Sequence, residues 1–223
     1  MSEQTYNSAF RYYYWGPLLL KFDLPKEEID ILLNDSYDIV DKKNLMHERL
    51  AGNINGEYQF TDQHREKHID FLEKYFRDYI TFKTHEWLPN VGPKFDRQQY
   101  IEYDYESSWV NFQKRNEYNP IHSHAGHLSY VIYLQIPEEI KKEKKIRNTI
   151  PPGSIQFIYT IPPTTLTDRD KDFNVPIDSM NWMPSTGEMF VFPSYLRHQV
   201  EAFNSDVTRI STSGNLFVKW KHS

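Results

Sequence analysis

The chain has 223 residues and a formal net charge of −5, which gives no global electrostatic attraction to nucleic acid. It contains no cysteine, so disulfides, zinc–thiolate sites, iron–sulfur clusters and a cysteine nucleophile are excluded. No apolar run approaches the roughly 20 residues that span a bilayer, and the N-terminus carries no secretory signal pattern. We therefore expect one domain in the cytoplasm, with no membrane or nucleic-acid partner.

The N-terminal part of the chain predicts a short β segment followed by a helix. Residues 10–24 have the pattern of a strand, a Gly-Pro turn and a second strand. Pro25 then marks a helix start, and residues 26–41 repeat apolar side chains at helical spacing, namely Ile29, Leu32, Leu33 and Tyr37.

A second and longer helix is predicted over residues 62–82, with Thr61 or Asp62 as its cap. Its apolar face consists of Ile69, Leu72, Phe76, Tyr79 and Ile80. His64 and His68 share another face, and the charged residues beside them predict that this face is exposed to solvent.

Two alternating segments, residues 98–105 and 108–113, predict strands that lead into the sequence NPIHSHAGHLSYVIYLQ. Three histidines lie within six residues of it: His122, His124 and His127. If the chain is extended at the first two, they project from the same face, because side chains of a strand alternate. Two imidazoles so spaced can chelate one metal ion. The Ala-Gly pair that follows bends the chain, so His127 stays open as an alternative ligand. The apolar run LSYVIYL after it predicts a buried strand.

The middle of the chain is less regular. Residues 141–147, KKEKKIR, are typical of an exposed hairpin tip, and residues 151–159 predict a turn and a strand. Residues 161–186 form a long proline-rich stretch with little sign of regular structure, as in functional loops. Its candidates for substrate contact are Asp168, Arg169, Asp170 and Trp182.

A second informative stretch begins at Gly187 and reads GEMFVFPSYLRHQVEAFNSDVTRISTS. It contains an apolar strand, then a proline, then His198. After a polar turn, Arg209 lies eleven residues beyond His198, and Ser211 follows two residues later. Arg209 and Ser211 would point to the same side of one strand.

The order of these motifs resembles the C-terminal half of Fe(II)/2-oxoglutarate-dependent oxygenases. The motif G-x-[LM]-x-[VI]-F-P-S-x-L-x-H ends at His198, the R-I-S segment begins at Arg209, and H-x-H-x4-S-x3-Y-L begins at His122. The similarity covers roughly residues 100–217. More narrowly, the chain resembles small oxygenases of phage and marine bacterial genomes that are related to prolyl hydroxylases.

The resemblance implies a double-stranded β-helix, and the short strands between turns also favour an antiparallel jelly roll. We therefore expect an α+β protein. Residues 96–223 would form the jelly-roll core, and residues 1–95 would be mainly helical support within the same domain.

For the metal, the resemblance implies Fe(II) bound by His122, His124 and His198. His124 stands where most members of the superfamily carry a carboxylate, since the usual set is two histidines and one carboxylate. Three neutral imidazoles would leave the bound iron one unit more positive, which would change its redox potential.

For 2-oxoglutarate, the resemblance implies that Arg209 binds the distal carboxylate, with Ser211 and Tyr133 adding hydroxyl groups. A guanidinium can bind a carboxylate through two parallel hydrogen bonds. Asn111, on the preceding strand, would touch the other end of the cofactor or the substrate.

The implied activity is hydroxylation of a C–H bond in a peptide, a protein or a small molecule, with release of succinate and carbon dioxide. It needs no catalytic residue beyond the metal ligands, and ascorbate would serve to reduce the iron. If the protein is encoded by a phage, it would act in the cytoplasm of the host cell. Two other classes remain open: a cupin-like three-histidine dioxygenase without 2-oxoglutarate, and a non-enzymatic jelly-roll binding or virion module.

Overall fold

The computed structural model describes residues 16–41, 51–83, 101–144, 150–159 and 179–220. Its helices are α1 (Lys26–Asp41), α2 (Asp62–Phe82) and α3 (Glu138–Lys141). Its strands are β1 (Leu20–Asp23), β2 (Glu57–Gln59), β3 (Ile101–Gln113), β4 (Asn119–His122), β5 (Leu128–Gln135), β6 (Ile155–Ile158), β7 (Ser179–Trp182), β8 (Glu188–Pro193), β9 (Arg197–Val200) and β10 (Arg209–Trp220).

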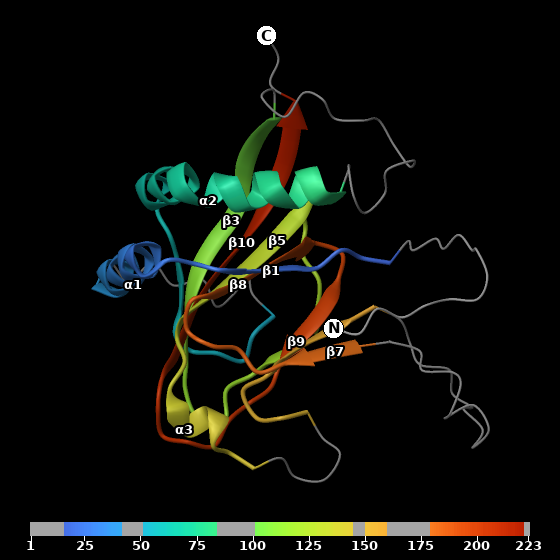
Figure 1. Ribbon diagram of the computed structural model, residues 1–223. Helices are drawn as coiled ribbons and strands as arrows, with labels where there is room; N and C mark the ends of the chain where they lie inside the picture. The colour runs from blue at the N-terminus through green and yellow to red at the C-terminus, as the bar shows by residue number, and fades with distance from the viewer. Residues whose placement is uncertain (1–15, 42–50, 84–100, 145–149, 160–178, 221–223) are drawn as a thin grey trace, which may run out of the picture.

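The strands form two antiparallel sheets (Figure 1). The larger sheet has the order β1-β8-β5-β10-β3-β2, and the smaller sheet has the order β4-β9-β6-β7. Nearly every connection in this order crosses from one sheet to the other or skips a strand, as in a jelly roll. The predicted α+β content with a jelly-roll core is confirmed.

The two long helices cover the outer face of the larger sheet (Figure 1). Their bounds are those predicted from periodicity, because the apolar face of each helix packs on the sheet: Leu32 and Phe76 are fully buried there. The side chain of Thr61 caps α2 by accepting the backbone N–H of His64.

The side chains of the central strand β5 are buried on both faces of the larger sheet. Ile132 and Leu134 belong to the core under the helices, whereas Val131 and Tyr133 belong to a second core between the sheets. This alternation explains why the strand is an almost continuous apolar run, since a strand buried on both sides has no solvent face. The second core fills only part of the space between the sheets, and a polar pocket occupies the rest.

The two strands predicted at residues 98–105 and 108–113 are one strand, β3. It pairs with β10 along its whole length, and the register shifts once, between Asn215 and Leu216. Ser107 lies opposite Asn215 and Tyr105 opposite Leu216, so Glu106 is an extra residue that forms a bulge. The bulge reverses the alternation of side chains, which is why the sequence pattern looked like two strands.

The predicted exposure of His64 and His68 is wrong. Both are buried, because α1 lies against this face of α2. His68 Nε2 lies 2.9 Å from Asp35 Oδ2, and His64 Nε2 lies 3.1 Å from Asp38 Oδ2. Burial lowers the pKa of His68 to about 4, although the Asp35 carboxylate opposes this shift.

Several predicted segments lie partly outside the described residues. Of residues 10–24, the described part forms one strand, β1, and Asp168, Arg169 and Asp170 are not described. Residues 179–182 form β7, where the sequence predicted no regular structure, and the basic run after residue 140 begins in the short helix α3. No helix in the described ranges is long and apolar enough to cross a membrane.

Candidate active site

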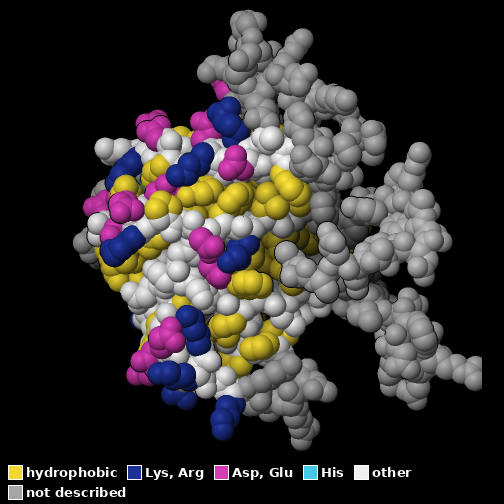
Figure 2. Space-filling model, viewed as in Figure 1, with side chains coloured by type: hydrophobic (Ala, Val, Ile, Leu, Met, Phe, Trp, Pro, Cys, Tyr) yellow, Lys and Arg dark blue, Asp and Glu magenta, His cyan; other side chains and the backbone are white. Residues whose placement is uncertain are grey.

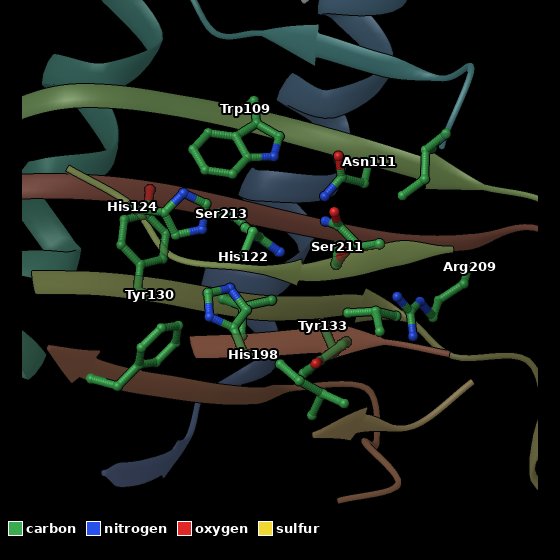
Figure 3. Close-up of a pocket in the computed structure, with 16 residues that line it drawn as sticks. Trp109, Asn111, His122, His124, Tyr130, Tyr133, His198, Arg209, Ser211 and Ser213 are labelled. Carbon is green, nitrogen blue, oxygen red and sulfur yellow. The ribbon is translucent and has the colours of Figure 1, made fainter. Parts of the chain in front are cut away.

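The structure brings three histidines together at one end of the polar pocket (Figure 3). His122 ends β4 and lies opposite His198 of β9, because the two strands are paired at these residues. His124 follows in the next turn, where its backbone N–H donates to the carbonyl of Ser194 at 2.9 Å. The potential ligand atoms of the three rings all lie within 4.8 Å of one another.

Backbone carbonyls fix the orientation of two of these rings. His122 Nδ1 lies 2.7 Å from the carbonyl oxygen of Pro120, and His198 Nδ1 lies 2.9 Å from that of Leu196. A carbonyl oxygen only accepts, so Nδ1 carries the proton in both rings and Nε2 keeps a lone pair. This arrangement of a ring held from behind is the usual support of a metal-binding histidine.

All three imidazoles are held in the neutral form that a metal requires. Burial lowers the pKa of His122, lowers that of His198 to about 4, and lowers that of His124 to about 3. His122 and His198 also disfavour a charge on His124, and His122 disfavours a charge on His198. Imidazole nitrogen suits Fe(II) as well as other transition metals, so the donor set fits the iron of the implied family.

His127 lies outside this cluster. Its ring packs edge-on against Phe217 at 5.4 Å, and its Nδ1 accepts the backbone N–H of Val218 at 3.0 Å. The bend after His124 therefore turns His127 toward the end of β10. Of the two alternatives that the sequence left open, the structure brings His124 to the other two rings.

At the other end of the pocket lies the guanidinium of Arg209, on β10 (Figure 3). The residue is only 3% exposed, and one terminal nitrogen donates to the carbonyl of Gly153 at 2.8 Å. Its Nε has no hydrogen-bond partner, and no carboxylate among the described residues forms an ion pair with it. Burial lowers the pKa of Arg209. A buried guanidinium of this kind calls for an anionic ligand.

Three further polar side chains lie between Arg209 and the histidines. Ser211 of β10 lies opposite Tyr133 of β5 on one side and Asn111 of β3 on the other, so the three share a row across the sheet. All three line the pocket. The hydroxyl of Tyr133 and the Oδ1 atom of Asn111 are buried and have no partner within the described part of the chain. The row can therefore hydrogen-bond a polar ligand that lies between Arg209 and the metal ligands.

Trp109 and Asn119 are among the residues of the pocket that the sequence reasoning missed. Trp109 lies 5.6 Å from the ring of His124, measured between centroids, and Asn119 of β4 lines the same pocket. Trp109 could have been found, because it precedes Asn111 by two residues on one strand and must share its face. Asn119 carries no such signal, since its position depends on the pairing of β4 with β9. Trp182, a candidate for substrate contact, lines a different, apolar cleft.

Solved structures with the same fold are enzymes of known type. A prolyl-4-hydroxylase of Pseudomonas putida has 11% identity and a TM-score of 0.53, and the match covers 92% of this chain and 93% of that one. A prolyl hydroxylase of Trichoplax adhaerens, in complex with a hypoxia-inducible-factor peptide, has 13% identity and a TM-score of 0.53 over 91% and 83% of the chains. The α-ketoglutarate-dependent carbocyclase SnoK has 11% identity and a TM-score of 0.50 over 91% and 81%.

At these low identities the structural similarity establishes only the fold, and the family assignment comes from the sequence. No curated protein matches the chain. Residues 107–215, about half of it, match the family described as "Putative 2OG-Fe(II) oxygenase". This range includes every candidate metal ligand and every candidate cofactor-binding residue. These residues form a pocket with neutral imidazoles at one end and, at the other, a guanidinium that forms no ion pair with any described carboxylate. Residues 107–215 therefore belong to the 2OG-Fe(II) oxygenase family, with iron and 2-oxoglutarate as cofactors.

Proposed function

We propose that this oxygenase binds iron through His122, His124 and His198, and that it hydroxylates a C–H bond of a peptide, a protein or a small molecule. The observation that carries the proposal is the polarity of the pocket. Three neutral imidazoles lie at one end, and at the other lies a buried guanidinium that has no carboxylate partner in the described part of the chain. A molecule with a chelating keto acid at one end and a carboxylate at the other satisfies both ends at once.

Each side chain has a definite task in this proposal. Arg209 forms the two-pronged hydrogen bond with the distal carboxylate of 2-oxoglutarate, and Tyr133 and Ser211 add hydroxyl groups. Asn111 donates its amide nitrogen to the other end of the cofactor. Trp109 lies beside the ring of His124 and helps to exclude water. Iron with 2-oxoglutarate supplies the oxygen activation and the oxidative decarboxylation to succinate and carbon dioxide.

His124 gives this site a distinctive charge. A carboxylate at its position would cancel one positive charge of Fe(II), whereas an imidazole cancels none. The site would therefore attract dianionic 2-oxoglutarate more strongly and would shift the redox potential of the iron upward.

A cupin-like dioxygenase without 2-oxoglutarate is the second candidate, and the three-histidine set is the observation that favours it. Against it stands the buried guanidinium of Arg209, for which a cupin-like reaction has no use. The substrate class remains a proposal in either case. Since two enzymes with this fold are prolyl hydroxylases and a third is a carbocyclase, both protein and small-molecule substrates are consistent with the fold.

The deciding experiment combines metal analysis with anaerobic titration of 2-oxoglutarate. We expect one Fe(II) per chain in the wild type, and loss of iron in His122→Ala and His198→Ala. His127→Ala is the matched control, because it removes a nearby imidazole that is outside the cluster. Wild-type iron content in the first two variants would contradict the ligand assignment. Iron binding without 2-oxoglutarate binding would favour the cupin-like candidate.

A further inference from the structure

A buried carboxyl group lies beside the pocket and takes no part in the proposed chemistry. Glu57 begins β2, the edge strand of the larger sheet, and pairs with Asn111 of β3. Opposite residues of an antiparallel pair point to the same face. Glu57 therefore faces the space between the sheets, as Asn111 does, whereas Tyr58 faces the helices and contacts Phe112. The side chain of Glu57 is 0% exposed.

Four side-chain oxygens at this edge lack a hydrogen-bond partner among the described residues. Both carboxyl oxygens of Glu57, Oδ1 of Asn119 and Oδ1 of Asn111 are buried and have no hydrogen-bond partner in the residues that the structure describes. Gly52 lies over them: a Cβ atom at this position would be 2.8 Å from Glu57 Oε1 and 3.4 Å from Asn119 Oδ1. Buried acceptors without donors are rare, because each loses its hydrogen bonds to water.

The surroundings of Glu57 are negative. Glu117, near the end of the connection from β3 to β4, accepts hydrogen bonds from the backbone N–H of Lys114 at 2.8 Å and from both the backbone and the side-chain amide of Asn55, at 3.1 and 2.7 Å. Both of its carboxyl oxygens are therefore hydrogen-bonded. No lysine, arginine or histidine among the described residues forms an ion pair with Glu57. Burial, and then the charge of Glu117, raise the pKa of Glu57 to about 8.

Asn111 and Asn119 line the pocket that holds the three histidines, and Glu57 pairs with Asn111 from the neighbouring strand. We propose that Glu57, Asn119 and Asn111 form a subsite that binds a cationic nitrogen group of the substrate, an ammonium or a guanidinium. The proposal rests on the proposed function, which makes this pocket the place where substrate binds. It narrows the substrate to molecules with an amine or a guanidine near the oxidised carbon.

The chemistry of the ligand follows from the acceptors. Carboxyl and amide oxygens accept, and an ammonium or guanidinium has only donors. Asn111 can use its oxygen here while its amide nitrogen serves the cofactor. A cation would also replace the charge partner that Glu57 lacks, whereas a neutral alcohol would bring one donor and no charge.

Binding of a cation should displace the proton of Glu57. The O–H bond of the neutral carboxyl breaks, the proton leaves to solvent, and the carboxylate pairs with the bound cation. Below pH 8 one proton is therefore released for each cation bound, and the affinity should rise by up to tenfold per pH unit. Above pH 8 this dependence should disappear.

Calorimetry on the full-length protein tests the subsite. The probes are n-butylammonium and n-butylguanidinium, with n-butanol as the neutral control. We expect saturable binding of a cation to the wild type, with uptake of one proton by the buffer at pH 7, and no binding of butanol. Glu57→Gln should weaken cation binding at least tenfold, and Gly52→Ala should weaken it severalfold by crowding the acceptors. Glu139→Gln, which removes an exposed carboxylate on α3, should have no effect.

Iron content and 2-oxoglutarate affinity, measured on the same proteins, separate this inference from the proposed function. Both should be unchanged in Glu57→Gln. If neither cation binds the wild type, or if Glu57→Gln binds it equally well, the subsite does not exist, although the iron and cofactor assignments still stand. Loss of 2-oxoglutarate binding in Glu57→Gln would also overturn the inference, because Glu57 would then support the cofactor pocket.

Discussion

Two buried glutamates, at opposite edges of the β-sandwich, differ in their partners. Glu188 begins β8, next to the edge strand β1, and is 9% exposed. It accepts hydrogen bonds from Trp182 at 2.8 Å, from the backbone of Ser185 at 2.9 Å and from Lys21 at 3.0 Å. Burial pushes its pKa up, but these donors outweigh burial, and the pKa is lowered. Glu57, at the β2–β4 edge, has none of these donors, and its pKa is raised to about 8.

The cavities at the two edges differ in the polar groups that line them. The edge formed by β1 and β7 opens into an apolar cleft of about 510 Å³, lined by Leu19, Phe157 and Trp182 among others. Hydrophobic side chains reach the surface on the face that carries β1 and α2 (Figure 2). The pocket between the histidines and Arg209 is narrower, and among the described residues it is lined by five side chains with an unpaired buried polar atom: Trp109, Asn111, Asn119, Tyr133 and Arg209. The comparison teaches that Glu188 and the cleft at the β1–β7 edge need no ligand, whereas the buried polar groups on the side of Glu57 and the histidines need ligands as partners.

The largest expected effect concerns Arg209, whose buried guanidinium forms no ion pair with a carboxylate among the described residues. Arg209→Ala should leave iron in place and reduce the affinity for 2-oxoglutarate by about two to four powers of ten, because a buried carboxylate without its cation costs roughly 3–5 kcal/mol. Arg209→Lys should recover only part of the loss, since an ammonium cannot form the two-pronged pair. Anaerobic calorimetry measures both. If Arg209→Ala bound 2-oxoglutarate as tightly as the wild type, the polar side of the sandwich would not need this ligand. The distinction between the polar side and the β1–β7 side would then be lost.

The next largest effect concerns how the folding stability of the ligand-free protein depends on pH. The pKa of Glu57 is raised in the folded state from its ordinary value of 4.5 to about 8. The folded protein therefore binds more protons than the unfolded chain, and stability should fall as pH rises from about 4.5 to 8, by about 3–5 kcal/mol in total. Glu57→Gln removes this loss and should be more stable than the wild type at pH 8. Chemical denaturation at pH 5 and pH 8 measures the difference.

Glu188→Gln should lower the stability of the protein at neutral pH, which is the opposite of the effect expected for Glu57→Gln. The lowered pKa of Glu188 means that its stabilisation is present above its ordinary value of 4.5 and is lost as pH falls. The amide keeps the shape but loses the ion pair with Lys21 and one acceptor, so we expect destabilisation by about 1–3 kcal/mol at pH 7. The same denaturation curves measure it. A stabilising Glu188→Gln would show that partners do not explain the difference between the two glutamates.

The smallest effect is expected from removing one donor of Glu188. Trp182→Phe keeps an aromatic ring against Phe190 but deletes the N–H that donates to the carboxylate. We expect a loss of about 1 kcal/mol in unfolding free energy at pH 7. Iron and 2-oxoglutarate binding serve as the control and should be unchanged, because Trp182 lies on the apolar side. A change in either affinity would mean that the two sides are coupled.

Local sequence determined the parts of this protein in which a pattern repeats over one or two turns or along one strand. The bounds of α1 and α2 follow from apolar periodicity, and the common face of Arg209 and Ser211 follows from alternation. The motif around His198 and the R-I-S segment were sufficient to predict the family, because the motif residues keep a fixed order and spacing.

Tertiary structure decided what depends on pairing between distant segments. His124 joins the cluster because its N–H binds Ser194, and His127 leaves it because the N–H of Val218 takes its lone pair. His68 is buried because a different helix covers it. Glu57 lies beside Asn111 because β2 pairs with β3 in one register, and Gly52 lies close to both Glu57 and Asn119. A sequence pattern reports which way a side chain points on its own element, but only the packing of the elements determines which partners it meets.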